Sequence, residues 1–186
     1  MPSVRFSTAR DLFDAFPTAK HDILAKPTNE GWLEFVASLM AKSEWNDTVG
    51  FCAYLLPRRE AVHWACQSVR VLSQHRTSDE EAALDAAEAW VRNPEETQRR
   101  AALDIGNRSP QDLPGTWTAL AAGWSGGVML QSEKGPVAAQ PYQTPKAVRA
   151  AILMAFTQVN IRERDRLIRP CIDHAVRMAS GDATGV

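Results

Sequence analysis

Apolar residues recur with a helical period in nearly every segment after Asn29, and no other feature constrains the fold of this chain as strongly. The first stripe holds five residues that share one face of a helix: Trp32, Phe35, Val36, Leu39 and Met40. Steps of three and four are typical of an amphipathic α-helix. Related patterns predict helices over residues 45–56, 58–73, 78–91, 94–105, 113–124 and 144–181. The chain is therefore expected to be all-α, a compact multi-helix bundle or orthogonal helical array.

Residues with special backbone preferences predict where these helices begin and end. Ser78 and Glu81 have the spacing of a capping box, which predicts a helix start at Ser78. The dipeptide Asn93-Pro94 predicts the next start, and Gly106-Asn107 predicts its end. Pro170 has no N–H to donate, so a kink or break is expected just before it.

The 186 residues fit one domain with a shared core. Residues 1–28 contain three prolines and are expected to form an N-terminal arm with short helical turns. Residues 29–181 are interpreted as a single helical domain and residues 182–186 as a frayed tail. Glycine and proline punctuate residues 125–143, which predicts one long ordered loop before the C-terminal helices, with room for one short hairpin.

Charge and hydropathy argue against several classes of function. A formal net charge of −1 does not suit a protein that grips nucleic-acid phosphates. The longest uninterrupted apolar run has seven residues, against the roughly 20 that a membrane-spanning helix needs. Three cysteines without paired ligand spacing suit reduced thiols in a cytoplasm. We therefore expect a cytoplasmic protein that binds no nucleic acid, no membrane and no cofactor.

Glu60, His63 and Cys66 follow one another at three-residue steps in one predicted helix. Neighbouring side chains at this spacing favour a pocket of a small hydrolase or metal-dependent enzyme. A di-iron or zinc site needs a second ligand pair from a facing helix, and the sequence offers none at ligand spacing. Cys171 and His174 share the spacing, but Cys171 continues an apolar stripe and is interpreted as a buried structural cysteine. No catalytic, cofactor or metal-binding residue is predicted.

Arg58 and Arg59 lie at a predicted helix start, where the helix dipole disfavours cations. Residues 78–96 carry seven acidic residues and one arginine. We therefore expect acidic partners for the two arginines, either from the helix over residues 79–88 or from another protein. Arg58 and Arg59 are accordingly candidate partner-binding residues, for another protein or for a second copy of the chain in a homo-oligomer.

The predicted loop carries an apolar island of Val128, Met129 and Leu130, and Tyr142 follows near its end. These side chains are too few to build a core of their own. They are expected either to dock on the domain or to bind another protein. The same four residues complete the set of candidate partner-binding residues.

The run from Phe51 to Arg70, followed by Trp124-Ser-Gly-Gly127, resembles an uncharacterised bacterial domain family of unknown function. That family is loosely associated with type VI secretion gene neighbourhoods. The resemblance is expected to extend from Val49 to about Ala179 and implies no catalytic residues. His63 stands where the resemblance implies an aromatic residue, which argues against a family-wide metal ligand there.

The leading interpretation is a non-enzymatic helical domain that binds another protein, as an adaptor or accessory factor of a bacterial secretion system. The alternative is the small hydrolase or metal-dependent enzyme with a pocket near Glu60, His63 and Cys66.

Overall fold

The computed structural model describes residues 5–181, and it is 67% helical. The described part contains nine α-helices, one short 3-10 helix and a single two-stranded sheet. In chain order the elements are α1 (Ala9–Ala15), η1 (Pro17–His21), α2 (Trp32–Ala41), α3 (Trp45–Leu55), α4 (Arg58–Leu72), α5 (Ser78–Arg92), α6 (Glu96–Arg108), α7 (Pro114–Gly123), β1 (Val128–Ser132), β2 (Gly135–Ala138), α8 (Gln143–Gln158) and α9 (Arg164–Ser180). The predicted all-α class is confirmed.

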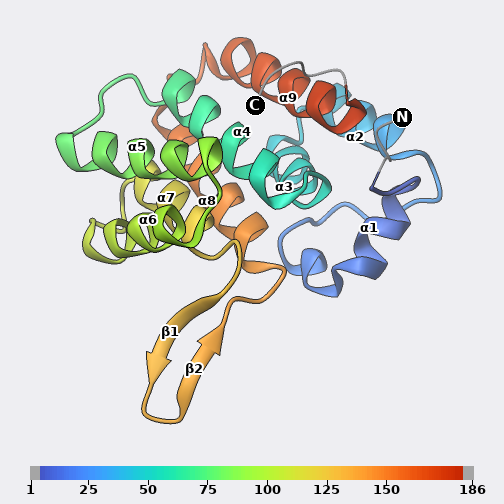
Figure 1. Ribbon diagram of the computed structural model, residues 1–186. Helices are drawn as coiled ribbons and strands as arrows, with labels where there is room; N and C mark the ends of the chain where they lie inside the picture. Colours follow the sequence, from blue (N-terminus) through green and yellow to red (C-terminus); the bar gives the residue numbers. More distant parts are fainter. Residues whose placement is uncertain (1–4, 182–186) are drawn as a thin grey trace.

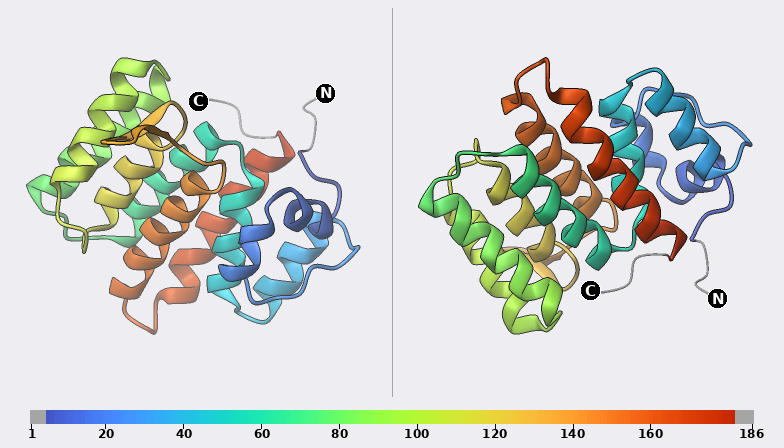
Figure 2. Two further views of the ribbon diagram at one scale, coloured as in Figure 1. Left: turned by 90° about the horizontal axis from the view of Figure 1, so that it is seen from below. Right: turned by 90° about the horizontal axis from the view of Figure 1, so that it is seen from above.

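The helices surround a central pair, α4 and α8, which pack against each other (Figure 1). Helices α5, α6 and α7 cover one side of this pair, whereas α1, α2 and α3 cover the other. Figure 2 shows the same division from above and from below, with α9 crossing over α3 and α4. No helix within residues 5–181 is both long and apolar enough to cross a membrane.

Aromatic side chains fill the core between these layers. Trp64 of α4 is completely buried, and its indole N–H donates to the carbonyl oxygen of Cys171 in α9 at 2.8 Å. The rings of Phe35 and Phe51 lie 4.8 Å apart between their centroids, and Phe13 contacts both. Four of the six tryptophans are buried, and their large rings fill the space beside helices that small residues bring close together: Trp32, Trp45, Trp64 and Trp90.

Residues 5–28 pack onto the same core. Leu12 and Phe13 of α1 are buried, and the phenol of Tyr54 donates to the Asp22 carboxylate at 2.5 Å. An isolated bridge pairs Thr8 with Gly31 and ties this segment to the start of α2. The expected frayed tail, residues 182–186, lies outside the described residues.

Two glycines let α6 and α7 approach closely. A Cβ atom on Gly123 would lie 2.7 Å from Leu103 Cβ, and one on Gly106 would lie 2.7 Å from Leu120 Cδ2. Both distances are shorter than packed carbon atoms allow. Each helix therefore offers a glycine to the leucine of the other, in a reciprocal pair three residues apart.

Helix α5 begins at Ser78 as predicted, but its predicted cap was wrong, and so were both predicted ends of α6. Helix α5 is capped by Thr77, whose side chain accepts a hydrogen bond from the Glu80 N–H, so Ser78 is already helical. Helix α6 begins at Glu96 rather than Pro94 and runs through Gly106-Asn107 to Arg108. In that helix the packing against Leu120 outweighs the weak helix preference of glycine.

The expected break before Pro170 was wrong, because Pro170 lies inside α9, whereas the alternative, a kink, stays a prediction. The chain turns earlier, over residues 159–163, between α8 and α9. Pro170 is exposed, and only three helical turns follow it. The apolar stripe of Ile168, Cys171, Ile172 and Ala175 stays buried across the proline, so burial of this face holds the helix together.

The corrected cap of α5 is testable with two neighbouring alanine variants. Thr77→Ala should lower the free energy of unfolding by about 1 kcal/mol, since it removes an N-cap hydrogen bond. Ser78→Ala should change it by less than about 0.5 kcal/mol, since Ser78 is an exposed helical residue. Urea unfolding of both variants measures the difference. A larger loss in Ser78→Ala than in Thr77→Ala would show that Ser78 is the cap, as the sequence pattern predicts.

Candidate functional site

A hairpin of β1 and β2 projects from the helical body (Figure 1). Within the described residues its strands pair only with each other, in antiparallel register, with a bulge between Val128 and Leu130. Leu130 and Val137 lie directly opposite each other, and they are 56% and 38% exposed. Opposed residues point to the same face of a sheet. The hairpin therefore presents an apolar pair to solvent outside the core.

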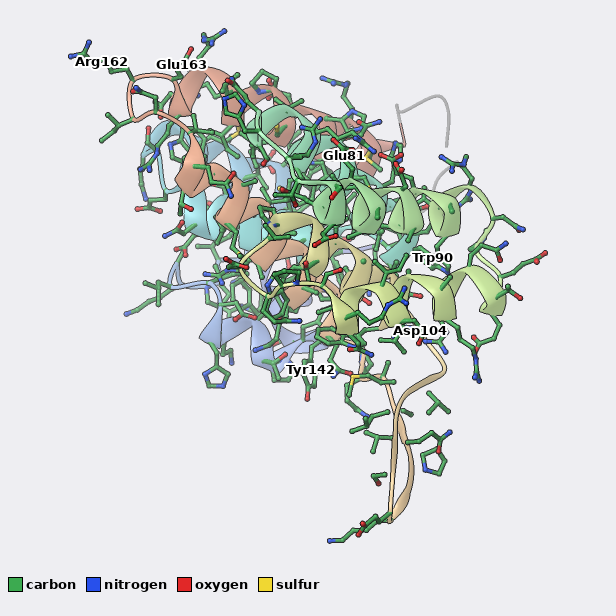
Figure 3. All side chains as sticks on the ribbon, turned by 90° about the vertical axis from the view of Figure 1, so that its left-hand side faces the viewer. Glu81, Trp90, Asp104, Tyr142, Arg162 and Glu163 are labelled. Carbon is green, nitrogen blue, oxygen red and sulfur yellow. The ribbon has the colours of Figure 1, made fainter. Side chains whose placement is uncertain are left out.

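A groove lies between β1 and α6. Its volume is about 350 Å³, and it combines the apolar side chains of Leu103, Val128, Met129 and Leu130 with the polar side chains of Arg100 and Asp104. Figure 3 shows Asp104 on α6, on the side of the body from which the hairpin projects. The Asp104 carboxylate forms no ion pair within residues 5–181. An apolar groove with an uncompensated charge at its edge is typical of a protein-binding surface.

Arg99 anchors the first strand of the hairpin to the body. Its side chain is only 4% exposed and donates to the carbonyl oxygens of Gly123 and Val128. The same guanidinium binds the Glu96 carboxylate with two hydrogen bonds, of 2.7 and 2.8 Å. Gly127 passes over it with a φ of +62°, a conformation that favours glycine, and a Cβ there would lie 3.0 Å from Arg99 Nη2.

Hydrogen bonds from Arg99 and then from Arg100 lower the pKa of Glu96 to about 2. The hydrogen bonds with Glu96 likewise raise the pKa of Arg99. Both groups therefore stay ionised at any pH near neutrality. The anchor at the root of the hairpin is consequently permanent rather than switched by protons.

Arg58 lies at this root, and within residues 5–181 neither Arg58 nor Arg59 pairs with the acidic residues of α5, so the expected acidic partner from another protein stays a prediction. Arg58 donates to the carbonyl oxygen of Ser125 at 2.6 Å, and Arg59 donates to that of Val91 at 2.7 Å. The acidic residues of α5 instead bind Arg70, which contacts Glu81, Asp85 and Glu88. Both arginines therefore donate to carbonyl oxygens at or just after the C-terminal ends of helices, α7 for Arg58 and α5 for Arg59, where the helix dipole favours cations.

Of the apolar island predicted from the sequence, Leu130 is exposed, whereas Val128 and Met129 are half-buried at the root. Gln143 donates to the Met129 sulfur at 2.8 Å. Tyr142 is half-buried against the core, and the Lys146 ammonium lies 5.8 Å from its ring centroid. Figure 3 shows Tyr142 near the junction of hairpin and body. The structure thus brings Arg58, the island and Tyr142 to one region, whereas Arg59 donates to the end of α5.

The residues of the enzyme alternative do not assemble a recognisable centre. Cys66 is 1% exposed, and burial raises the pKa of its thiol far above the ordinary range. The His63 ring lies 6.2 Å from that of His174, and its Nε2 lies 3.0 Å from the Gln67 amide nitrogen. Within residues 5–181, no group of three His, Cys, Asp or Glu side chains is placed to hold a metal ion.

The two histidines should make stability depend on pH. Desolvation lowers the pKa of each below its ordinary value of 6.5, and nearby arginines lower both further, Arg59 for His63 and Arg177 for His174. Glu88 opposes part of the shift at His63. Below pH 6.5 the unfolded chain therefore binds protons more readily than the folded chain, and stability falls as the pH decreases.

We expect the free energy of unfolding to fall by less than about 1 kcal/mol between pH 7.5 and 5.5, because both rings are partly exposed. The paired variant His63→Gln, His174→Gln should lose less over the same interval. Urea unfolding at the two pH values checks this. Equal losses in both proteins would show that other groups control the dependence.

Sequence reasoning missed the residues that build the root of the hairpin and its groove. Arg99, Arg100 and Asp104 look like ordinary polar residues of a helix. A signal was nevertheless present, because Arg99 falls on the same face as Ala102 and Leu103, where a charged side chain needs a buried partner.

The fold and the site define a compact helical domain that carries one projecting hairpin. The chain belongs to a family of unknown function, DUF6931, whose model matches residues 35–179. The expected resemblance to such a family is confirmed, although the match begins 14 residues before the predicted Val49 and includes most of α2. No curated protein and no solved structure matches the chain significantly.

Proposed function

We propose that this domain binds another protein and that the β1–β2 hairpin, with the groove beside α6, is its binding element. The observation that carries the proposal is the exposure of Leu130 and Val137 on an element that contributes nothing to the core. An apolar pair in water costs free energy unless a partner covers it. The anchored root supports the same function, because a fixed element loses less entropy on binding than a flexible one.

The domain would serve as an adaptor or accessory factor, and the resemblance to a family near type VI secretion genes makes that system the first candidate. A cytoplasmic setting suits the three free cysteines, all of which are buried. A net charge of −1 supports a protein partner over a nucleic acid. The hydrolase or metal-dependent alternative has weaker support, because a buried Cys66 with a raised pKa is a poor nucleophile or ligand.

Affinity capture from a lysate of the native host tests the proposal. Wild-type protein and the variants Leu130→Asp and Val137→Asp are compared with Val71→Asp. Val71 is a suitable control, because it is 46% exposed and lies on α4, outside the hairpin. A specific protein should be captured by the wild type and by Val71→Asp and lost with both hairpin variants.

Two results would overturn this assignment. One is retention of the same protein by both hairpin variants. The other is its loss only when Arg59, which does not touch the hairpin, is reversed to Glu. The second result would place the interface on the basic start of α4.

A further inference from the structure

The position of Pro136 shows which backbone N–H and C=O groups of the hairpin point away from the partner strand. Pro136 lies opposite Gln131 in the register, and proline has no N–H to donate. This pair therefore cannot be a hydrogen-bonded pair of the ladder. Hydrogen-bonded and non-hydrogen-bonded pairs alternate along antiparallel strands. The hydrogen-bonded pairs are therefore Leu130 with Val137 and Ser132 with Gly135. The N–H and C=O groups of Gln131 consequently point away from β2, to the free edge of β1.

The two edges of the hairpin are not equivalent. Opposite Gln131, the outer edge of β2 has no backbone N–H donor, because the residue there is Pro136. Strand β1 contains neither proline nor a charged residue. A two-stranded ribbon is marginally stable alone, and an uncharged edge with its donors intact favours a further strand. The edge of β1 is therefore the side that accepts one.

We propose that the added strand is β1 of a second copy of this chain, so that two hairpins form one antiparallel four-stranded sheet. This inference rests on the proposed function and names the first partner of the hairpin. An antiparallel strand pair has the two-fold symmetry of a closed dimer. With the two-fold axis at Gln131, each Gln131 donates to the carbonyl oxygen of the other. Ser132 of the second copy then lies opposite Leu130, and its turn, Glu133 and Lys134, comes beside the bulge at Val128 and Met129.

Charge complementarity selects a second copy as the occupant. Val128 and Met129 line the groove beside α6, so the incoming tip arrives where Asp104 lies. Lys134 at the tip is exposed and, like Asp104, forms no ion pair within residues 5–181. The dimer brings Lys134 of each copy to Asp104 of the other. One symmetric arrangement thus places Lys134 beside Asp104 twice, and the neighbouring Glu133 of each tip enters the groove that also holds Arg100.

The dimer also enlarges the hairpin surface that we propose to bind another protein. A two-fold axis perpendicular to the sheet keeps Leu130 and Val137 of both copies on one face. Four exposed apolar side chains then form a continuous patch, as at the centre of a protein interface. The second copy would therefore assemble the face on which another protein docks.

Sedimentation of the full chain over a range of concentrations tests the pairing. We expect a reversible species of twice the chain mass of 20.5 kDa. Gln131→Pro removes the outward N–H but no bond inside the hairpin, and it should weaken the dimer by at least about tenfold, since symmetry counts each lost bond twice. Gln131→Ala keeps the N–H and should dimerise within about threefold of the wild type.

Charge exchange between Lys134 and Asp104 tests the register. Asp104→Lys and Lys134→Asp should each weaken the dimer by about fivefold or more, and their combination in one chain should restore it. Asp112→Lys is the control, because Asp112 is exposed and lies in the loop between α6 and α7. It should leave the dimer unchanged.

A monomer at every concentration would overturn the inference, as would a dimer that Gln131→Pro and the charge variants leave intact. Neither result touches the proposed function, which fails only if the hairpin variants still capture the same protein from the lysate. The two ideas therefore fail separately.

Discussion

Gly123→Ala should destabilise the domain by about 2–3 kcal/mol and lower its Tm by about 4–10 °C. This is opposite to the usual effect, because alanine stabilises most helices relative to glycine by about 1 kcal/mol. The reason is the backbone of α6, since the new Cβ would lie 2.8 Å from Leu103 Cα. A side-chain tip could move aside, but a backbone atom cannot move without shifting the helix.

Gly126→Ala is the matched control for this prediction. A Cβ on Gly126 meets nothing within 4 Å, and the residue lies only three positions away. We expect a change below about 0.5 kcal/mol there. Calorimetry or urea unfolding of the two variants decides the matter. A stable Gly123→Ala protein would mean that α6 and α7 are not held by the reciprocal glycine and leucine contacts.

Arg99→Met should have the second large effect, a loss of about 2–4 kcal/mol. Methionine keeps much of the aliphatic volume but leaves the Gly123 and Val128 carbonyl oxygens without their shared donor. The Glu96 carboxylate also loses two hydrogen bonds. The loss combines several broken bonds around one buried guanidinium, so it exceeds that of a single surface ion pair.

Arg100→Met is the control, because Arg100 binds the same Glu96 but is 64% exposed in its side chain. Its loss should cost less than about 0.5 kcal/mol. Hydrogen exchange adds a local readout, since only Arg99→Met should speed exchange in residues 127–139. If both variants behave alike, the hairpin is not anchored through Arg99.

Helices with a strong apolar period were predictable from the sequence. Residues 45–56 and 58–73 were expected to be helical, and α3 and α4 occupy Trp45–Leu55 and Arg58–Leu72. The apolar stripe within residues 58–73 is buried, and it consists of Ala61, Ala65, Val69 and Leu72. Local chemistry and burial point to the same element there, so the pattern alone is sufficient.

Predictions failed where tertiary contacts outweigh local preference. Gly106 is typical of a helix end, but α6 continues through it. A residue without a Cβ is required there, because Leu120 of α7 fills the space that a Cβ would take. Pro170 reads as a break, but it lies in α9 because the helix face around it is buried. Thr77 has the same spacing to Glu80 as Ser78 has to Glu81, so the pattern alone does not distinguish the two, and the structure shows Thr77 as the cap.

The candidate site was predictable only in part. The apolar island at Val128, Met129 and Leu130 indicated an interaction element. The hairpin register, and with it the outward groups of Gln131, depends on pairing that a five-residue strand does not specify. The groove could not be predicted, since it brings together α6 and β1, whose residues lie 20 or more positions apart in the sequence.

Photo-crosslinking tests the central claim, that the hairpin is the protein-binding element, most directly. A photoreactive amino acid is placed at Val137 on the hairpin or at Val71 on α4, and the protein is irradiated in a lysate of the native host. We predict a discrete crosslinked product from position 137, to a second copy or to another protein, and none from position 71. Leu130→Asp should abolish that product. Equal crosslinking from both positions, or a product that survives Leu130→Asp, would contradict the account.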